Sequence, residues 1–229
     1  VAAFFIVYAL LWGLSNPSLW GKLNYTVRYL FYSKEGIFST PVNVCSKFIV
    51  VFIIFGAFLE RTGIADFFIQ ISNAFVGGFS GGPAKVSVVA SAMEGMVSGS
   101  SVANTVGSGS VTIPLMKRTG YKPEFAAAVE AAASTGGQIM PPIMGAAAFL
   151  MAEYMDLPYM QVAVKAILPA VLYFAGIFIT VHLEAKKLGL KGIPKDQLPK
   201  VGYLLKKVYL LLPLVLLIAL VSSGARTMQ

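Results

Sequence analysis

The sequence has little charge, a single cysteine and a single histidine. Only 12% of its 229 residues are charged, about half the usual share for a soluble domain, whereas 57% are hydrophobic and the mean hydropathy is +0.75. This balance excludes a disordered chain, a coiled coil and an ordinary soluble domain, and it indicates a membrane protein. Cys45 alone excludes an internal disulfide and a cysteine metal cluster, and His182 alone excludes a multi-histidine metal site.

The net charge of +8 is interpreted by position, because membrane proteins gather Lys and Arg in cytoplasmic loops. We therefore expect no nucleic-acid partner. Residues 184–207 carry seven lysines and predict a cytoplasmic loop. Counting crossings back from this loop places the Asp156 turn outside and Lys117-Arg118 in the cytoplasm. Because Lys117-Arg118 is itself a basic pair, the two basic segments predict the same orientation.

Apolar runs alternate with polar segments along the chain. The chain begins inside an apolar run, so we expect a piece of a longer polypeptide in which residues 1–14 end a transmembrane helix. Residues 48–59, 166–183 and 208–219 predict membrane crossings, although the first is short for one. Apolar residues recur at helical spacing over residues 64–79, which predicts an amphipathic helix in the membrane interface.

The polar stretch 98–112 lies between apolar segments. Eleven of its fifteen residues are Ser, Thr, Asn or Gly, and no charge occurs between Gly95 and Met116. A helix over residues 84–97 would cover roughly 21 Å, whereas the hydrocarbon core is about 30 Å thick. We therefore predict a re-entrant hairpin over residues 83–118, with a non-helical polar tip at the depth of the membrane.

A second interruption follows in the next helix. Pro123 opens a helix that halts at residues 134–138, Pro141-Pro142 follows, and the residues continue apolar to Ala152. The pattern predicts a discontinuous transmembrane helix over residues 123–155.

Two neighbouring interruptions at membrane depth favour an ion or substrate site over simple helix packing. A helix that ends at the hairpin tip has free carbonyls that suit a cation, and one that begins there has free N–H groups that suit a carboxylate. Neutral oxygens without a carboxylate cluster are poor ligands for Mg²⁺ or Ca²⁺ and fit a monovalent cation such as sodium. Glu94 and Glu130 are ionisable residues at this depth, either functional or paired with Lys or Ser side chains inside the bundle.

Several motifs resemble one family. Residues 98–121, beginning Ser-Gly-Ser-Ser-Val-Ala-Asn-Thr-Val-Gly-Ser-Gly, resemble the first hairpin of the large membrane subunit of tripartite ATP-independent periplasmic (TRAP) transporters. Residues 130–149, which include Ser-Thr-Gly-Gly-Gln-Ile-Met-Pro-Pro-Ile-Met-Gly, resemble the TAXI branch of that family. Shorter motifs at residues 56–60, 81–85 and 182–185 agree. The chain resembles the N-terminal half of such a subunit.

The resemblance implies a fold class and a division of the chain. The fold would be an all-α polytopic membrane protein, one inverted repeat of an elevator-type transporter. Residues 1–80 would hold scaffold-like transmembrane helices, an interfacial loop and the amphipathic arm helix. Residues 81–156 would form half of the transport domain, and residues 157–229 the following transmembrane helices with the basic loop.

The resemblance also implies a function and site residues. The chain would be a permease subunit, not an enzyme, that takes up organic acids with Na⁺ as coupling ion and without an organic cofactor. The residues expected to bind sodium come from the tip and the break: Ser98, Gly99, Ser100, Ser101, Asn104, Gly136, Gly137 and Gln138. The residues expected to bind substrate are Ser101, Asn104, Thr105, Ser134, Thr135 and Pro141.

The implied partners are an extracytoplasmic substrate-binding protein, a small membrane subunit or its fused equivalent, the second half of the permease, a small organic acid and the lipid bilayer of a prokaryotic inner membrane. An ion channel and a structural membrane subunit remain alternatives, because a re-entrant loop can line a pore. A membrane-embedded serine protease is disfavoured, since His182 lies far in depth from the serines of the tip.

Orientation gives a first testable prediction. In intact cells that make the complete protein, a cysteine introduced by Lys191→Cys should resist impermeant thiol reagents, because the lysines of its loop hold that loop in the cytoplasm. Labelling is measured before and after the membrane is permeabilised. Ready labelling from outside would reverse the whole predicted orientation.

Overall fold

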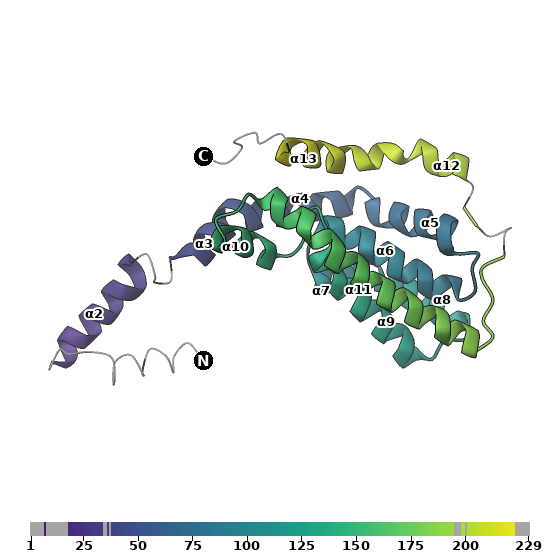
Figure 1. Ribbon diagram of the computed structural model, residues 1–229, viewed down its shortest axis with the longest axis horizontal. Helices are drawn as coiled ribbons and strands as arrows, with labels where there is room; N and C mark the ends of the chain where they lie inside the picture. The colour runs from purple at the N-terminus through teal and green to yellow at the C-terminus, as the bar shows by residue number, and fades with distance from the viewer. Residues whose placement is uncertain are drawn as a thin grey trace. The chain divides into compact units, whose positions relative to one another are not determined.

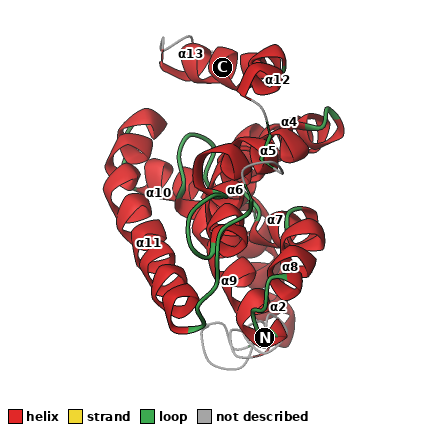
Figure 2. Ribbon diagram, turned by 90° about the vertical axis from the view of Figure 1, so that its right-hand side faces the viewer, coloured by secondary structure: helices red, strands yellow, loops and turns green. Residues whose placement is uncertain are grey.

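The computed structural model describes residues 18–33, 38–194 and 201–222, together with Val7, Gly36, Leu198 and Pro199. Over these residues the chain is helical and has no strand (Figure 2), which confirms the predicted all-α class. The crossing expected to end at residue 14 lies outside the described residues, apart from Val7. Residues 195–197 and 200 of the basic loop also lie outside them.

The chain divides into two compact units, residues 1–49 and residues 50–229. The first contains α2 (Leu19–Tyr32), α3 (Thr40–Val44) and a π-helical turn η1 (Cys45–Ile49). Helix α2 begins at Ser18, whose hydroxyl accepts a hydrogen bond from the Gly21 amide at 3.1 Å. Aromatic side chains of α2 are exposed, Trp20 at 78% and Tyr32 at 85%, so this helix buries little of its apolar surface.

The second unit holds the remaining helices (Figure 1). They are α4 (Val50–Arg61), α5 (Ile64–Val76), α6 (Gly82–Ser98), α7 (Ser101–Gly107), α8 (Gly109–Arg118), α9 (Pro123–Gly136), the 3-10 turn η2 (Gly137–Ile139), α10 (Ala146–Tyr154), α11 (Tyr159–Lys187), α12 (Val201–Lys206), the 3-10 turn η4 (Val208–Leu211) and α13 (Leu212–Ser222).

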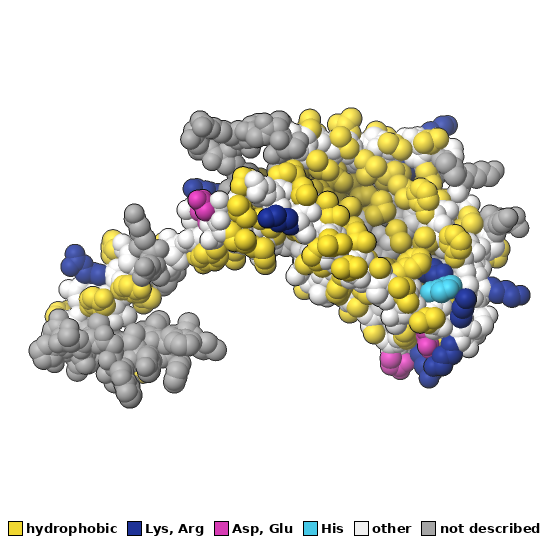
Figure 3. Space-filling model, in the orientation of Figure 1, with side chains coloured by type: hydrophobic (Ala, Val, Ile, Leu, Met, Phe, Trp, Pro, Cys, Tyr) yellow, Lys and Arg dark blue, Asp and Glu magenta, His cyan; other side chains and the backbone are white. Residues whose placement is uncertain are grey.

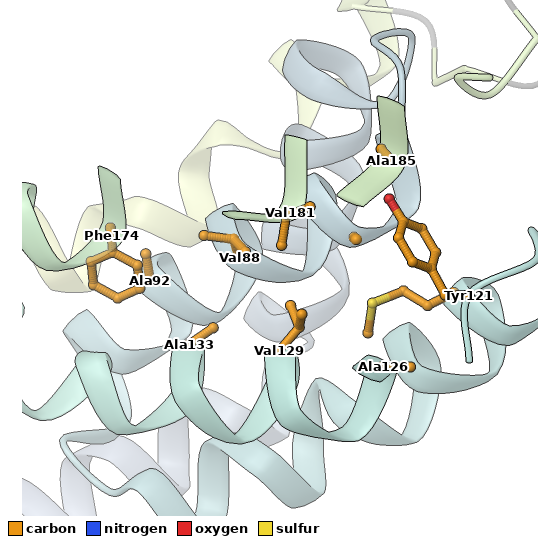
Figure 4. Close-up of a cluster of buried hydrophobic side chains, with 11 residues drawn as sticks. Val88, Ala92, Tyr121, Ala126, Val129, Ala133, Phe174, Val181 and Ala185 are labelled. Carbon is orange, nitrogen blue, oxygen red and sulfur yellow. The ribbon is translucent and has the colours of Figure 1, made fainter. Parts of the chain in front are cut away.

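Helices α6, α9 and α11 enclose the larger apolar core (Figure 4). Small residues on all three helices, such as Ala92, Ala133 and Ala185, let the backbones approach, and Val88 and Phe174 fill the space between them. A second cluster joins α4 and α5 to the C-terminal end of α6 and to α12 and α13, around Phe67 and Phe68. Helix α6 therefore belongs to both cores and is buried along most of its length.

The closest contact between α6 and the segment after α9 is made by two glycines. A Cβ atom added to Gly95 would overlap the backbone of Gly137, and one added to Gly137 would lie 2.7 Å from the Gly95 Cα. Two backbones can meet this closely only where neither residue has a side chain. Gly95 and Gly99 form a GxxxG pattern in the sequence. Gly95 allows the two backbones to pack closely, whereas Gly99 has φ +59 and ends α6 in a left-handed turn.

Among the described residues, two helices are long and apolar enough to cross a membrane by length and composition, Thr40–Leu59 and Tyr159–Lys187. Helix α11 buries one face in the core and exposes the opposite one. That exposed face carries large apolar side chains, namely Val164, Leu168, Val171, Leu172, Ile179 and Leu183. Apolar side chains also cover much of the visible surface of the second unit in Figure 3, and the charged ones lie mostly near its ends. Such a surface suits contact with lipid rather than water.

The structure differs from the expected non-helical tip at residues 98–112. Within this stretch only Gly99, Ser100 and Ser108 lie outside a helix, because α6 ends at Ser98, α7 spans Ser101–Gly107 and α8 begins at Gly109. The polar residues are compatible with helix because their hydroxyls bond to nearby backbone groups. Ser100 caps α7 through the Ala103 amide, and the Thr105 hydroxyl donates to the Ser101 carbonyl at 2.8 Å.

The compact units also differ from the three predicted segments. Helix α5 packs along α6, and α11 packs along α6 and α9, so parts of residues 1–80 and 157–229 share a core with residues 81–156. The boundary between residues 49 and 50 separates two groups of residues that make most of their contacts within their own group. Division into scaffold and transport parts concerns motion, and it stays a prediction.

The Gly95–Gly137 contact generates a prediction on stability. Gly95→Ala should lower the free energy of unfolding by about 1–3 kcal/mol or more, because its methyl group meets backbone that cannot rotate away. Gly176→Ala is the matched control in α11, where an added Cβ meets nothing within 4 Å, and helix propensity should make it neutral or slightly stabilising. Thermal unfolding of both variants in detergent measures the difference. Equal midpoints would mean that the two backbones are not in close contact.

Candidate functional site

The turn after α6 lies against the interruption between α9 and α10. A Cβ atom on Gly99 would overlap the Met144 carbonyl oxygen, and one on Gly145 would lie 3.4 Å from the Gly99 carbonyl oxygen. The hairpin turn and the broken segment, separated by about forty residues in sequence, therefore meet backbone to backbone. Both places expose polar backbone groups, because neither segment is helical at the contact.

Residues 137–145 form an ordered loop. The Gly145 amide donates to the Gln138 carbonyl at 2.7 Å and closes the loop on itself. Met144 is 2% exposed and has φ +56, a backbone conformation that costs a non-glycine residue about 1–3 kcal/mol. The Tyr159 hydroxyl, at the start of α11, donates to the Pro142 carbonyl at 2.8 Å and also contacts the Ile143 carbonyl. The surrounding contacts thus fix where the loop carbonyls lie.

One hydrogen bond between side chains joins the turn to the loop. The Gln138 amide nitrogen donates to the Ser101 hydroxyl oxygen at 2.9 Å. Ser101 is the first residue of α7, and Gln138 lies in η2. Both were expected at the sodium site, and the structure brings them into direct contact.

Asn104 is fully buried one turn into α7. Its side-chain nitrogen donates to the Ser91 carbonyl of α6 at 2.8 Å, and it would lie 3.1 Å from a Cβ on Gly137. The amide therefore ties α7 to α6 beside the contact with η2. The side-chain oxygen accepts only a long contact of 3.4 Å from the Ser108 hydroxyl.

The expected site residues fall into two groups. Those brought together at the contact between turn and loop are Ser98, Gly99, Ser100, Ser101, Asn104, Gly137 and Gln138. Four others have local partners. The Thr105 and Thr135 hydroxyls bond to their own helices, and Ser134 donates to Glu130. Pro141 lines an apolar cavity of about 400 Å³ with Met96 and Ile167.

Gly136 packs tightly against α11. A Cβ atom there would overlap the Tyr173 ring of α11, while the Tyr173 hydroxyl donates to the Ala132 carbonyl at 2.8 Å. Substitutions at Gly136 or Gly137 would therefore disturb the fold before they tested ion binding.

The residues around Glu130 were missed as a group. Their hydroxyls surround this buried carboxylate from α6, α8, α9 and the residue between α7 and α8, and they belong to Ser87, Ser91, Ser108, Thr112 and Ser134. The sequence carried a signal for them, because hydroxyl residues recur four apart at 87 and 91 and at 108 and 112, and Ser134 lies four residues after Glu130. Residues four apart lie on one helix face. The structure shows that Glu130 is paired with Ser and Thr hydroxyls inside the bundle.

At the N-terminal end of α6, a buried lysine contacts α11. Lys85 is 3% exposed, its ammonium lies 2.9 Å from His182 Nδ1, and the Phe79 and Phe178 rings flank it. Its ammonium therefore joins α6 to α11. Nearby, burial raises the pKa of the Tyr121 hydroxyl to about 12, with a smaller contribution from Glu184.

A match between this chain and a protein-family model agrees with these features. The family model described as "Tripartite ATP-independent periplasmic transporter, DctM component" matches residues 2–229. The chain belongs to the TRAP transporter large-permease family. The predicted family is thereby confirmed, while the TAXI branch and the interpretation as an N-terminal half stay predictions.

Curated TRAP permeases are similar over most of this chain. A C4-dicarboxylate TRAP transporter large permease of Vibrio cholerae is 34% identical over 152 residues, 66% of this chain and 32% of that protein. A C4-dicarboxylate large permease of Pseudomonas aeruginosa is 28% identical over 192 residues, 83% of this chain and 44% of its own length. A sialic acid TRAP permease of Haemophilus influenzae is 24% identical over 176 residues, 77% and 27% of the two chains. The chain thus spans less than half the length of these relatives.

Asn104 gives a prediction for this TRAP permease chain. Asn104→Ala should lower the free energy of unfolding by about 1–2 kcal/mol, because the buried contact with α6 loses its hydrogen bond. Thr105→Ala is the control, since it removes a hydroxyl that bonds only within α7, and its effect should be smaller. Thermal unfolding in detergent measures both. A smaller effect at Asn104 than at Thr105 would mean that the amide does not hold α7 on α6.

Proposed function

We propose that this chain forms part of the permease subunit of a sodium-coupled secondary transporter that takes up organic acids. The observation that carries the proposal is the contact between the hairpin turn at Gly99 and the broken segment at residues 137–145. Paired helix interruptions of this kind serve as ion and substrate sites in secondary transporters. Membership of the TRAP permease family supports the same class of function.

Sodium would bind where neutral oxygens converge. The side chains available for it are the hydroxyls of Ser98, Ser100 and Ser101 and the Gln138 amide, and the backbone carbonyls of Gly99 and Met144 lie at the same contact. This donor set has no carboxylate, which suits a monovalent cation better than a divalent one. Bound sodium would supply a positive charge next to the substrate carboxylate.

The substrate would lie against the same turn. Ser101, Asn104, Thr105, Ser134, Thr135 and Pro141 are the residues we propose for this wall. Ser101 is the strongest of these because it lies at the contact itself, whereas Asn104 and Ser134 have partners inside the bundle. The curated relatives carry names that specify C4-dicarboxylates and sialic acid, so carboxylates are the substrate class to test first.

The remaining parts of the transporter follow from the family. We propose an extracytoplasmic binding protein that delivers the substrate, a small membrane subunit or a fused equivalent, and a second half of the permease that supplies the other wall of the site. The protein would lie in a prokaryotic inner membrane and move its transport part by an elevator mechanism. The TAXI-like motif over residues 130–149 supports placement in that branch.

Uptake by the complete transporter in proteoliposomes tests the proposal. Radiolabelled succinate and sialic acid are offered with the binding protein, under an inward sodium gradient or an equal potassium gradient. Uptake that requires both sodium and the binding protein is expected. Equal uptake in potassium would reject sodium coupling, uptake without the binding protein would reject that partner, and steady ion flux without substrate would favour a channel.

Ser101 provides the sharpest single substitution. Ser101→Ala should weaken apparent sodium affinity about five- to 150-fold, by analogy with the 1–3 kcal/mol cost of a lost buried hydrogen bond. Ser110→Ala is the control, because this exposed hydroxyl bonds only to the Gly107 carbonyl of its own hairpin. Uptake is measured against sodium concentration at matched expression. If both variants keep the normal sodium response, the cation site lies away from the hairpin turn.

A further inference from the structure

Glu130 lies in the middle of α9 with no exposed surface. Five hydroxyl groups, all equally buried, lie within hydrogen-bond distance of its two carboxylate oxygens. On Oε2 they are Ser87 at 2.6 Å and Thr112 at 2.5 Å, and on Oε1 they are Ser108 at 2.5 Å, Ser91 at 2.8 Å and Ser134 at 3.2 Å. This carboxylate therefore has a complete shell, and every hydrogen-bond partner described for it is neutral.

A charged carboxylate can be satisfied by this shell. It has about four lone-pair positions, and each hydroxyl can donate one hydrogen. Five hydroxyls thus offer one donor more than an ionised Glu130 needs. The surplus donor can bond to the backbone instead, since the Ser108 hydroxyl also lies 2.8 Å from the Asn104 carbonyl oxygen.

A neutral carboxylic acid can be satisfied by the same atoms. If Oε2 carries a proton, it donates to the Thr112 hydroxyl oxygen at 2.5 Å, and the Thr112 hydrogen turns to the Ser108 carbonyl at 3.0 Å. No heavy atom has to move. Buried polar groups are costly when one state leaves a partner unsatisfied, and here neither state does.

No charged side chain among the described residues contacts this carboxylate. On α6, the Lys85 ammonium lies against His182 of α11, and Glu94 lies against Gly107 at the end of α7. The other charged residues on the packed helices are Lys117 and Arg118 in the last turn of α8, Glu124 in the first turn of α9, Lys165 in α11, and Glu184, Lys186 and Lys187 at the end of α11. The charge of Glu130 is thus balanced by hydroxyl dipoles or by a proton.

We propose that Glu130, with Ser87, Ser91, Ser108, Thr112 and Ser134, is a proton-binding site inside the permease. One proton from water forms one O–H bond on the carboxyl group, no other covalent bond changes, and the protein gains one positive charge. The site lies between the hairpin helices and α9, which together carry the turn and the break. Resting on the proposed transport function, one further consequence is that uptake depends on pH through this residue.

Infrared spectroscopy of the complete transporter in lipid tests the proton site without any transported substrate. Spectra are recorded at equilibrium across the pH range in which the protein stays folded, in H₂O and in D₂O. A carboxylic-acid carbonyl band that grows as the pH falls and shifts in D₂O is expected from Glu130. Glu130→Gln should abolish that band, whereas Glu124→Gln, an exposed position on the same helix, should leave it in place.

A hydroxyl substitution extends the test to the shell and keeps it decisive if Glu130→Gln fails to fold. Thr112→Val preserves side-chain shape but removes the hydroxyl that donates to the charged carboxylate and accepts from the acid. The carbonyl band of the protonated Glu130 should therefore shift in frequency, because its O–H group loses the Thr112 acceptor. Ser110→Ala, on the exposed side of the same helix, should leave the band unchanged.

The outcomes separate the two proposals. A Glu130 band that does not change with pH, or a band that Thr112→Val does not shift, would overturn the proton site whatever the transporter carries. If the band titrates, uptake of radiolabelled succinate is compared across pH for wild type and Glu130→Gln. Uptake whose pH dependence survives in Glu130→Gln would overturn the link to transport, and absence of uptake by wild type would bear on the proposed function alone.

Discussion

Polar groups inside an apolar helical body need partners, and this requirement organises the second unit. A helix that stops in such surroundings leaves backbone groups whose burial costs several kcal/mol each unless something bonds to them. Around the interruption after α9, the Tyr173 hydroxyl bonds to the Ala132 carbonyl, and the Gly145 amide closes on the Gln138 carbonyl. The loop that forms the candidate site is therefore a bonded structure of defined shape.

The same requirement sets the register between helices. Ser87 and Ser91, one turn apart on α6, bond to different oxygens of the single Glu130 carboxylate on α9. A slide of α6 by one turn along α9 would leave only one of the two serines beside the carboxylate. Because α6 ends at Gly99, this register fixes where the hairpin turn meets the broken segment. The hydrogen-bonded cluster and the candidate ion site are thus mechanically linked through one helix.

Much of this arrangement could be predicted from composition and breaker residues. Gly99, Pro141 and Pro142 marked the two interruptions, and the apolar runs marked the long helix α11, since these signals act locally along the chain. Helicity beyond the turn could not be predicted from composition. A run of Ser, Thr and Gly favours loops in general, but here side-chain to backbone bonds stabilise α7 and α8. The hydroxyl shell of Glu130 could not be predicted either, because sequence spacing shows which residues share a helix face and not which helix faces pack together.

The length of α11 has a consequence for where water and lipid headgroups lie. Its 29 residues extend roughly 44 Å, whereas a hydrocarbon core is about 30 Å thick. The helix must tilt or extend beyond the hydrocarbon by about nine residues. Its C-terminal turns carry Lys186 and Lys187 and follow directly on the Lys85–His182 contact. That end belongs among headgroup phosphates, so charge anchors it there, while packing against α6 and α9 sets the angle of the helix.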